Sequence, residues 1–193
     1  MKPPSKSELD DCRHCDLWRE ATQGVPGRGP EDAALMLVGE QPGDEEDVAG
    51  RPFVGPAGRL LAAVLEEAGI APKSVYVTNA VKHFKWEPRG KRRLHKRPNV
   101  AEVRACNPWL LREIEAVKPK VIVALGATAA RGVLGADVAV GEARSDLFRH
   151  PLGAAVCVTY HPSAVLRGME RADELREALL DDLKAAKHLL SRN

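Results

Sequence analysis

Two cysteines near the N-terminus have the spacing of a metal or cluster site. Cys12 and Cys15 are separated by two residues, so both thiolates can bind one zinc ion or one iron–sulfur cluster. A redox dithiol is the third possibility, although such a pair is expected between a strand and a helix, a setting that this segment lacks. A structural disulfide is not expected, because the sequence shows no signal peptide and cytosolic thiols stay reduced.

The other two cysteines and the histidines decide how this site could be completed. Cys157 lies inside the apolar run Ala154–Val158 and is interpreted as a small buried hydrophobic residue. Cys106 then joins the first pair as a third thiolate, which leaves one position for an imidazole. His14 is awkwardly placed between the first two cysteines, so His83 is the better candidate. The spacing does not choose between zinc and a cluster.

A second group of residues concentrates positive charge around one histidine. Residues 82–104 contain nine basic and two acidic side chains, so this stretch carries +7 while the other 170 residues carry −5. The net charge of +2 conceals this asymmetry. Pro88 and Gly90 interrupt any helix, so residues 87–98 are predicted to form an exposed basic loop that contains His95. Clustered Lys and Arg bind nucleic acid by releasing counterions from its phosphates; the alternative is a solvated loop.

Four apolar runs predict the strands that must position these groups. The runs are continuous rather than alternating, which is typical of parallel strands covered on both faces. They are Ala33–Val38, Val75–Thr78, Val121–Leu125 and Ala155–Thr159. Helical patterns occur at Pro56–Ala68, Val100–Val117, Ala127–Leu134 and Ala172–Leu190. Strands alternating with helices predict an α/β fold, a three-layer α/β/α sandwich with a central four-stranded parallel sheet.

Polar loops follow three of the four predicted strands. The first strand is followed by GEQPGDEED, the second by Asn79 and the basic stretch, and the fourth by HPSAVLR. The carboxyl ends of parallel strands meet at one edge of a sheet, where ligands bind in such folds. Any one of these loops is explained by turn formation, but the three together indicate a functional site.

Length and composition favour one globular domain over residues 1–193. The chain is 44% hydrophobic and 29% charged, which excludes a disordered polymer. The longest apolar run, Val121–Ala130, is far shorter than the roughly 18 residues of a membrane span. No phosphate-loop motif occurs, which argues against a nucleotide enzyme of that class. We therefore expect a monomeric cytoplasmic protein, associated with the nucleoid in a bacterium, with no membrane partner.

Four segments in order resemble the uracil-DNA glycosylase superfamily, and specifically its family 4 branch. GEQPGDEED resembles the first motif, GRPFVGPAG the substrate-stacking segment, TNAVKH the second motif and HPSAVLR the last. The resemblance runs from Cys12 to Arg167. Family 4 members generally have a cysteine in place of His83 and lack the insertion KRRLHK at residues 91–96. Both departures, together with Gln41, resemble the UdgX-type uracil-DNA glycosylases.

This resemblance implies a four-iron, four-sulfur (4Fe-4S) cluster. Its ligands would be Cys12, Cys15, His83 and Cys106, and zinc at the same residues is the alternative. The N-terminal cluster-binding segment would span about residues 8–20. We expect such a cluster to fasten this segment to the DNA-facing loop rather than to carry electrons.

The resemblance also implies a site for a uracil base that has been flipped out of the DNA stack. The amide of Asn79 can read N3–H and O4 of uracil, and Phe53 supplies a stacking face. His161 can donate to uracil O2 as negative charge develops on the leaving base. Further contacts are expected around the first motif, from Gln41, Gly43 and Asp44.

UdgX-type proteins excise uracil and then become covalently joined to the DNA through the histidine of the basic loop. That residue is His95 here, so we expect it to bond to C1′, with Glu40 orienting the imidazole and accepting its second proton. Asp44 and Asp47 are placed to pair with arginines of the loop. DNA contacts are expected from Lys91, Arg92, Arg93, Lys96, Ser163 and Arg167.

The expected partner is uracil-containing DNA, single-stranded by preference and double-stranded as the second form. One alternative is a hydrolytic family 4 enzyme whose basic loop only adds DNA affinity. The other is a non-enzymatic iron–sulfur protein, which would bind DNA whether or not it contains uracil.

Overall fold

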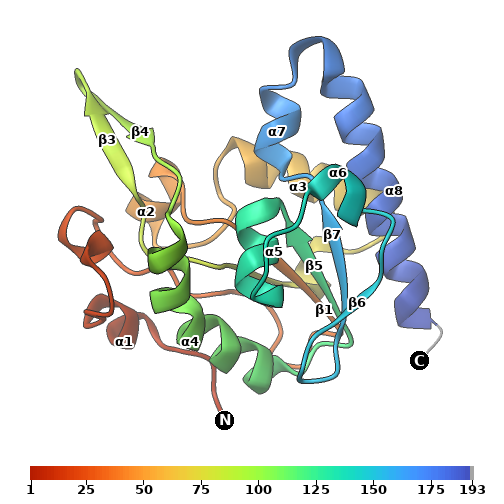
Figure 1. Cartoon of the computed structure of the whole chain (residues 1–193), viewed down its shortest axis with the longest axis horizontal. Helices are drawn as coiled ribbons and strands as arrows, with labels where there is room; N and C mark the ends of the chain where they lie inside the picture. Colours follow the sequence, from red (N-terminus) through yellow and green to blue (C-terminus); the bar gives the residue numbers. More distant parts are fainter. Residues whose placement is uncertain (192–193) are drawn as a thin grey trace.

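The central sheet contains the four predicted parallel strands and one further strand. The computed structural model describes residues 1–191, and its sheet has the order β2–β1–β5–β7–β6 (Figure 1). The parallel strands are β1 (Leu35–Gly39), β2 (Tyr76–Asn79), β5 (Val121–Leu125) and β7 (Ala155–Thr159). Strand β6 (Phe148–Arg149) pairs antiparallel with β7 at the edge. The prediction of four strands therefore missed this edge strand, which is too short to leave a hydrophobic pattern.

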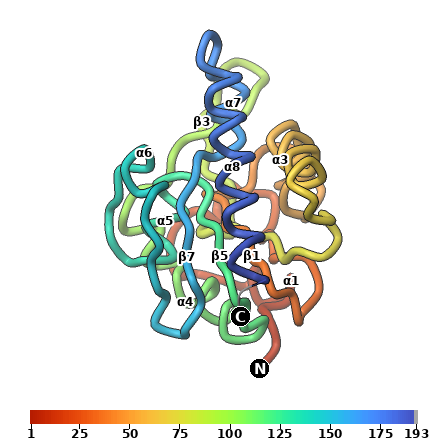
Figure 2. Tube along the Cα trace, turned by 90° about the vertical axis from the view of Figure 1, so that its right-hand side faces the viewer, coloured from red at the N-terminus to blue at the C-terminus, as the bar shows by residue number. Residues whose placement is uncertain are grey.

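Helices cover both faces of this sheet, as predicted. Helices α3 (Pro56–Glu67) and α8 (Ala172–Ser191) pack on one face, and α8 lies along the strands in Figure 2. Helices α4 (Val100–Val117) and α5 (Ala127–Leu134) pack on the other. Leu35 and Leu37 of β1 point to the first face and Met36 and Val38 to the second. This strand is apolar throughout because both of its faces are buried.

The remaining elements are short and lie around the sandwich. The short helices are α1 (Lys6–Asp10), α2 (Asp44–Ala49), α6 (Val140–Ala143) and α7 (Pro162–Leu166), and 3₁₀ turns occur at Asp16–Arg19, Pro72–Ser74 and Met169–Arg171. Helix α2 was not predicted, because four of its six residues are acidic and no apolar stripe marks it. Within residues 1–191, no helix is both long and apolar enough to cross a membrane.

The predicted basic loop is a β-hairpin in the structure. Strands β3 (Trp86–Arg89) and β4 (Arg92–His95) form a separate two-stranded sheet, which projects from the sandwich in Figure 1. The prediction was wrong about regular structure because it took Pro88 as a breaker. Proline is tolerated in a strand with a free edge. Gly90 begins the two-residue turn with a φ of +60°, which tight hairpin turns require at this position.

Candidate active site

One cavity at the carboxyl ends of the parallel strands gathers most of the predicted site. Its volume is about 430 Å³. All eight predicted catalytic and base-contacting residues line it, together with the two predicted DNA contacts of the last motif: Glu40, Gln41, Gly43, Asp44, Phe53, Asn79, His95, His161, Ser163 and Arg167. Topology explains this convergence, because β1, β2 and β7 all end at this edge.

Glu40 holds His95 at the mouth of the cavity. Nε2 of His95 lies 3.1 Å from Oε1 of Glu40, and the His95 side chain is 47% exposed. The second carboxylate oxygen accepts a hydrogen bond of 2.5 Å from the Thr128 hydroxyl, which in turn accepts one from Arg97. Burial raises the pKa of Glu40, but the hydrogen bonds from His95 and Thr128 outweigh it and hold the pKa below its ordinary value. Glu40 is therefore a carboxylate at neutral pH.

His161 is fixed in one tautomer by its own chain. It caps α7, and its Nδ1 accepts the backbone N–H of Ser163 at 3.1 Å, with the Ser163 hydroxyl 2.8 Å away. Burial lowers the pKa of His161 to about 4, against the opposing effect of Glu40. The ring is therefore neutral at pH 7, and the proton is on Nε2 because Nδ1 accepts a hydrogen bond. A neutral donor of this kind can stabilise an oxyanion.

Phe53 and Asn79 meet at Gly39, the last residue of β1. A Cβ at Gly39 would lie 2.4 Å from Oδ1 of Asn79 and 2.7 Å from Cζ of Phe53. Phe53 has a φ of +56°, a left-handed conformation that costs free energy for a residue with a side chain. Its ring lies 6.2 Å from that of His161, with an angle of 28° between the planes. The rings of Phe53 and His161 therefore lie beside the Asn79 amide.

Gln41 attaches the hairpin to the end of β1 rather than facing the cavity with a free amide. Its Oε1 accepts the N–H of Lys85 at 2.9 Å, and its Nε2 donates to the carbonyls of Lys85 and Lys96 at 3.0 and 3.1 Å. The side chain is buried. The side-chain amide of Gln41 is therefore fully occupied by backbone groups at both ends of the hairpin, and a contact of Gln41 with the base, which stays a prediction, falls to its backbone.

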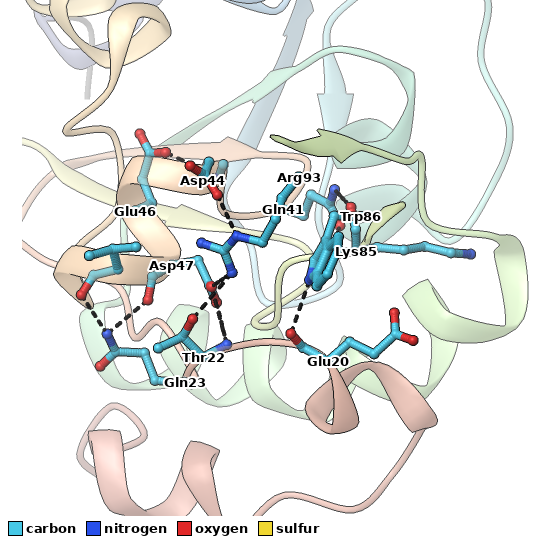
Figure 3. Close-up of polar contacts among 12 residues, drawn as sticks. Glu20, Thr22, Gln23, Gln41, Asp44, Glu46, Asp47, Lys85, Trp86 and Arg93 are labelled. Atoms are coloured by element: carbon cyan, nitrogen blue, oxygen red, sulfur yellow. Dashed lines mark hydrogen bonds and ion pairs between the residues drawn. The ribbon is translucent and has the colours of Figure 1, made fainter. Parts of the chain in front are cut away.

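Arg93 faces inward, toward helix α2. Its guanidinium contacts Asp44 and the fully buried Asp47, each at 2.6 Å, and lies over the rings of Phe84 and Trp86. Figure 3 shows these carboxylates and Arg93 converging. The predicted pairing of the two aspartates with the loop is present. The phosphate contact expected of Arg93 stays a prediction, and it would have to compete with these two carboxylates.

The exposed charge of the hairpin lies at its tip. Arg89, Lys91 and Arg92 are exposed, and none has an ion-pair partner among residues 1–191. Lys96, at the base, lies 3.4 Å from Glu87. The hairpin therefore has an anchored inner side and a tip whose three cations are available to phosphates.

Three of the four predicted metal ligands lie near one another. Cys15 and Cys106 belong to one apolar cluster with Leu17, Val81 and Val103. Cys12 Sγ accepts a hydrogen bond from the Trp109 indole, and Cys106 Sγ accepts the Lys82 backbone N–H, both at 3.2 Å. Burial raises the pKa of Cys106 to about 12. Among residues 1–191, however, no three His, Cys, Asp or Glu side chains are arranged closely enough to hold a metal ion.

The surroundings of His14, Cys157 and His83 complete the description of this region. His14 is exposed and stacks on Trp109, with 5.6 Å between ring centroids. Cys157 of β7 packs against the apolar cluster on the first face of the sheet, as a hydrophobic residue would, but it is half-buried rather than buried. His83 is buried, and burial lowers its pKa.

Comparison with known proteins identifies the family. The model of the uracil DNA glycosylase superfamily matches residues 26–184. This chain belongs to that superfamily. A type-4 uracil-DNA glycosylase from Thermotoga maritima is 41% identical over 182 residues, which are 94% of this chain and 90% of the relative.

Two further members of the superfamily are also similar to this chain. A type-4 uracil-DNA glycosylase from Pyrobaculum aerophilum is 37% identical over 166 residues, covering 82% of this chain and 81% of the relative. A type-5 uracil-DNA glycosylase from the same organism is 32% identical over 178 residues, covering 82% and 74%. The predicted superfamily and its α/β fold are thus confirmed.

Sequence reasoning missed Thr128, which contacts Glu40 at this glycosylase-type site. It lies in the first turn of α5, directly beyond β5, the one parallel strand whose following loop was not weighed. The side chain is 1% exposed, and its hydroxyl fixes the Glu40 oxygen that does not face His95. A buried hydroxyl directly after a strand end was the available signal.

The burial of His161 leads us to predict how the free energy of unfolding depends on pH. Because its pKa falls from an ordinary 6.5 to about 4 on folding, the unfolded chain binds more protons between these values. Its contribution is complete above pH 6.5, and we expect the free energy of unfolding to fall as pH drops toward 4, by up to about 3 kcal/mol through this group. Urea unfolding at several pH values measures this slope, which the His161→Asn variant should reduce. An equal slope in both proteins contradicts the assignment.

Proposed function

We propose that this chain excises uracil from DNA, with a preference for single strands, and that His95 then bonds covalently to C1′ of the abasic deoxyribose. The observation that carries this proposal is the 3.1 Å contact between His95 and Glu40 at the mouth of a cavity that also contains Asn79, Phe53 and His161. The type-4 relatives support the uracil-DNA part. His83, Gln41 and the basic insertion support the UdgX-type part.

The base is held before its bond to the sugar breaks. Phe53 stacks on the uracil ring, and the Asn79 amide accepts from N3–H and donates to O4. Cytosine presents the reverse pattern at these positions, so the same amide fits it badly. When the C1′–N1 bond breaks, the electron pair leaves with uracil, and the Nε2–H of His161 donates to the developing charge on O2.

The sugar is left as an oxocarbenium ion, and His95 captures it. A ring-nitrogen lone pair forms the new bond to C1′, and the alkylated ring loses its remaining N–H proton to the Glu40 carboxylate. Uracil leaves as its anion and takes a proton from water. Thr128 keeps the second oxygen of Glu40 in place, so the first oxygen stays directed at the imidazole.

We further propose that Cys12, Cys15, His83 and Cys106 hold a 4Fe-4S cluster, with zinc as the alternative. The N–H groups that already contact two of the sulfur atoms support this assignment. When bound, a cluster would supply a covalent link between the N-terminal segment and α4. Iron and sulfide analysis of the purified protein, with an absorption band in the visible region, distinguishes a cluster from zinc.

The decisive experiment incubates the protein with a labelled single-stranded oligonucleotide containing one uracil, followed by boiling in SDS. We expect both free uracil and a shifted protein–DNA band. Uracil without a shifted band would identify a hydrolytic enzyme. Binding without uracil release would identify a non-enzymatic DNA-binding protein. Repeating the assay with the duplex form tests the strand preference.

The hairpin makes a separate prediction about salt dependence. Changing Lys91 and Arg92 at the tip to glutamine should lower the slope of log affinity against log salt by about 0.7 per lost phosphate contact on single-stranded DNA. Arg93→Gln should leave the slope nearly unchanged but lower the yield of covalent complex, because it releases β4 from α2. Fluorescence anisotropy between 50 and 200 mM salt, with a uracil-free oligonucleotide, measures the slopes. An equal drop for Arg93→Gln would mean that Arg93 contacts DNA.

The close packing around Gly39 leads us to predict that a Gly39→Ala variant releases uracil slowly. Adding one methyl group in Gly39→Ala must displace the Asn79 amide or the Phe53 ring, since the new carbon lies under 3 Å from both. We expect uracil release to fall at least tenfold, because a displacement of about 1 Å can lower a rate by about 10². Single-turnover release measures the effect. Gly141→Ala, whose Cβ would meet only the Tyr160 hydroxyl, at an ordinary contact distance of 3.5 Å, controls for the cost of adding a methyl group. A Gly39→Ala rate equal to the control's contradicts the proposed base site.

A further inference from the structure

Lys82 and Glu113 form a fully buried ion pair that takes no part in the reaction described above. Both side chains are 0% exposed, and Nζ of Lys82 lies 2.6 Å from Oε2 of Glu113. Lys82 follows β2, and Glu113 lies in α4. The pair is therefore located under the sheet edge that carries the cavity, but it does not line the cavity.

The three donors of the Lys82 ammonium group are all engaged. Besides Glu113, Nζ donates to the Thr78 hydroxyl oxygen at 2.7 Å and to the backbone carbonyl of Asn79 at 2.8 Å. Glu113 accepts from the Thr78 hydroxyl at 2.7 Å and from the Gly27 N–H at 2.9 Å. The network thus includes the backbone carbonyl of Asn79, whose side chain lines the cavity.

Stability alone does not account for such a pair. Removing two charges from water costs several kcal/mol per ion, and well-packed apolar side chains of similar volume are often as stable or more stable. An apolar pair has no hydrogen-bond donor, however, so it cannot fix the direction of a carbonyl group. Here the carbonyl belongs to Asn79, the last residue of β2, which is an edge strand of the central sheet.

We propose that the Lys82–Glu113 pair positions Asn79 and thereby sets the selectivity for the base. With its carbonyl held by Lys82 and the next N–H donating to Gly39 at 2.9 Å, the peptide after Asn79 has one orientation. The side-chain amide then enters the cavity at one angle. Lys82 is a positioning residue in this scheme, and the proposal rests on the proposed uracil site.

The test compares the affinities of two labelled single-stranded oligonucleotides by fluorescence anisotropy. One carries 2′-fluoro-2′-deoxyuridine, which binds like the substrate but resists cleavage, and the other carries a tetrahydrofuran abasic analogue. The ratio of the two affinities reports base recognition alone. In the double variant Lys82→Met/Glu113→Leu we expect this ratio to fall at least about tenfold, while the affinity for the abasic analogue is retained.

Thr78→Val is the matched control, because it removes a buried hydroxyl from the same network and leaves the Lys82 bonds to Glu113 and Asn79. Its ratio should equal that of the original chain. Glu113→Gln, which preserves the size of the side chain but removes its charge and one of its two acceptor oxygens, provides the test if the double variant does not fold. It should lower the ratio to a smaller extent.

The outcomes separate the two proposals. An unchanged ratio in a folded double variant, or in Glu113→Gln, overturns the positioning role. So does an equal fall in both affinities, since that reports general damage. If the original chain itself shows no preference for the uracil analogue, the proposed function fails before the variants are compared.

Discussion

The His95→Ser variant is expected to release uracil from single-stranded DNA without forming any complex that survives SDS. Serine leaves Glu40 in place but removes the ring nitrogen that would attack C1′. The smaller side chain also opens the mouth of the cavity, where His95 is half exposed, so water can reach the sugar cation. The denatured-gel assay and a parallel measurement of free uracil give the two readouts.

His188→Ser is the control, because His188 is an exposed histidine near the end of α8, away from the cavity. It should form the covalent complex as fully as the original chain. A covalent complex that persists in His95→Ser would mean that another side chain is the nucleophile.

The His161→Ala variant is expected to lose both products. Removing a single donor to a developing oxyanion lowers rates by about 10²–10³, and here that donor acts on bond cleavage, which precedes capture by His95. Uracil release and covalent complex should therefore fall together, in contrast to the His95 variant. Single-turnover release at neutral pH, where the ring is neutral, measures the loss.

Ser163→Ala offers a graded control for this prediction. It removes the hydroxyl next to Nδ1 but keeps the backbone N–H that fixes the tautomer, so its loss should be much smaller. A His161→Ala rate close to that of Ser163→Ala would remove His161 from the cleavage step.

The core of the fold was predictable because the physical cause of each buried element is local. The runs at β5 and β7 are apolar throughout, since helices cover both faces, and their predicted bounds match the structure. The bounds of α4 and α5 also match. Strand β6 and helix α2 lack such a pattern. Pro88 concealed β3, since its effect depends on whether the strand has a free edge.

The position of the candidate site was predictable for a different reason. Parallel topology brings strand ends together, so polar residues after three strands had to meet. Individual contacts were not predictable, since they join residues far apart in the chain. Thr128 reaches Glu40 across 88 positions, and Arg93 reaches Asp47 across 46. Nothing in the local sequence distinguishes an arginine that binds a phosphate from one that binds two aspartates.

The separate two-stranded sheet has a consequence for how this protein could be altered. No residue from 85 to 98 belongs to any of the three apolar clusters that hold the domain together. The hairpin is attached largely through polar contacts, which are made by Glu20, Glu40, Gln41, Asp44, Asp47 and Glu102. His95, the proposed nucleophile, therefore lies on a hairpin that belongs to none of these apolar clusters. Transplanting this hairpin with its anchoring residues into a hydrolytic enzyme of the same fold would show whether the covalent capture proposed for His95 can be transferred with the hairpin alone.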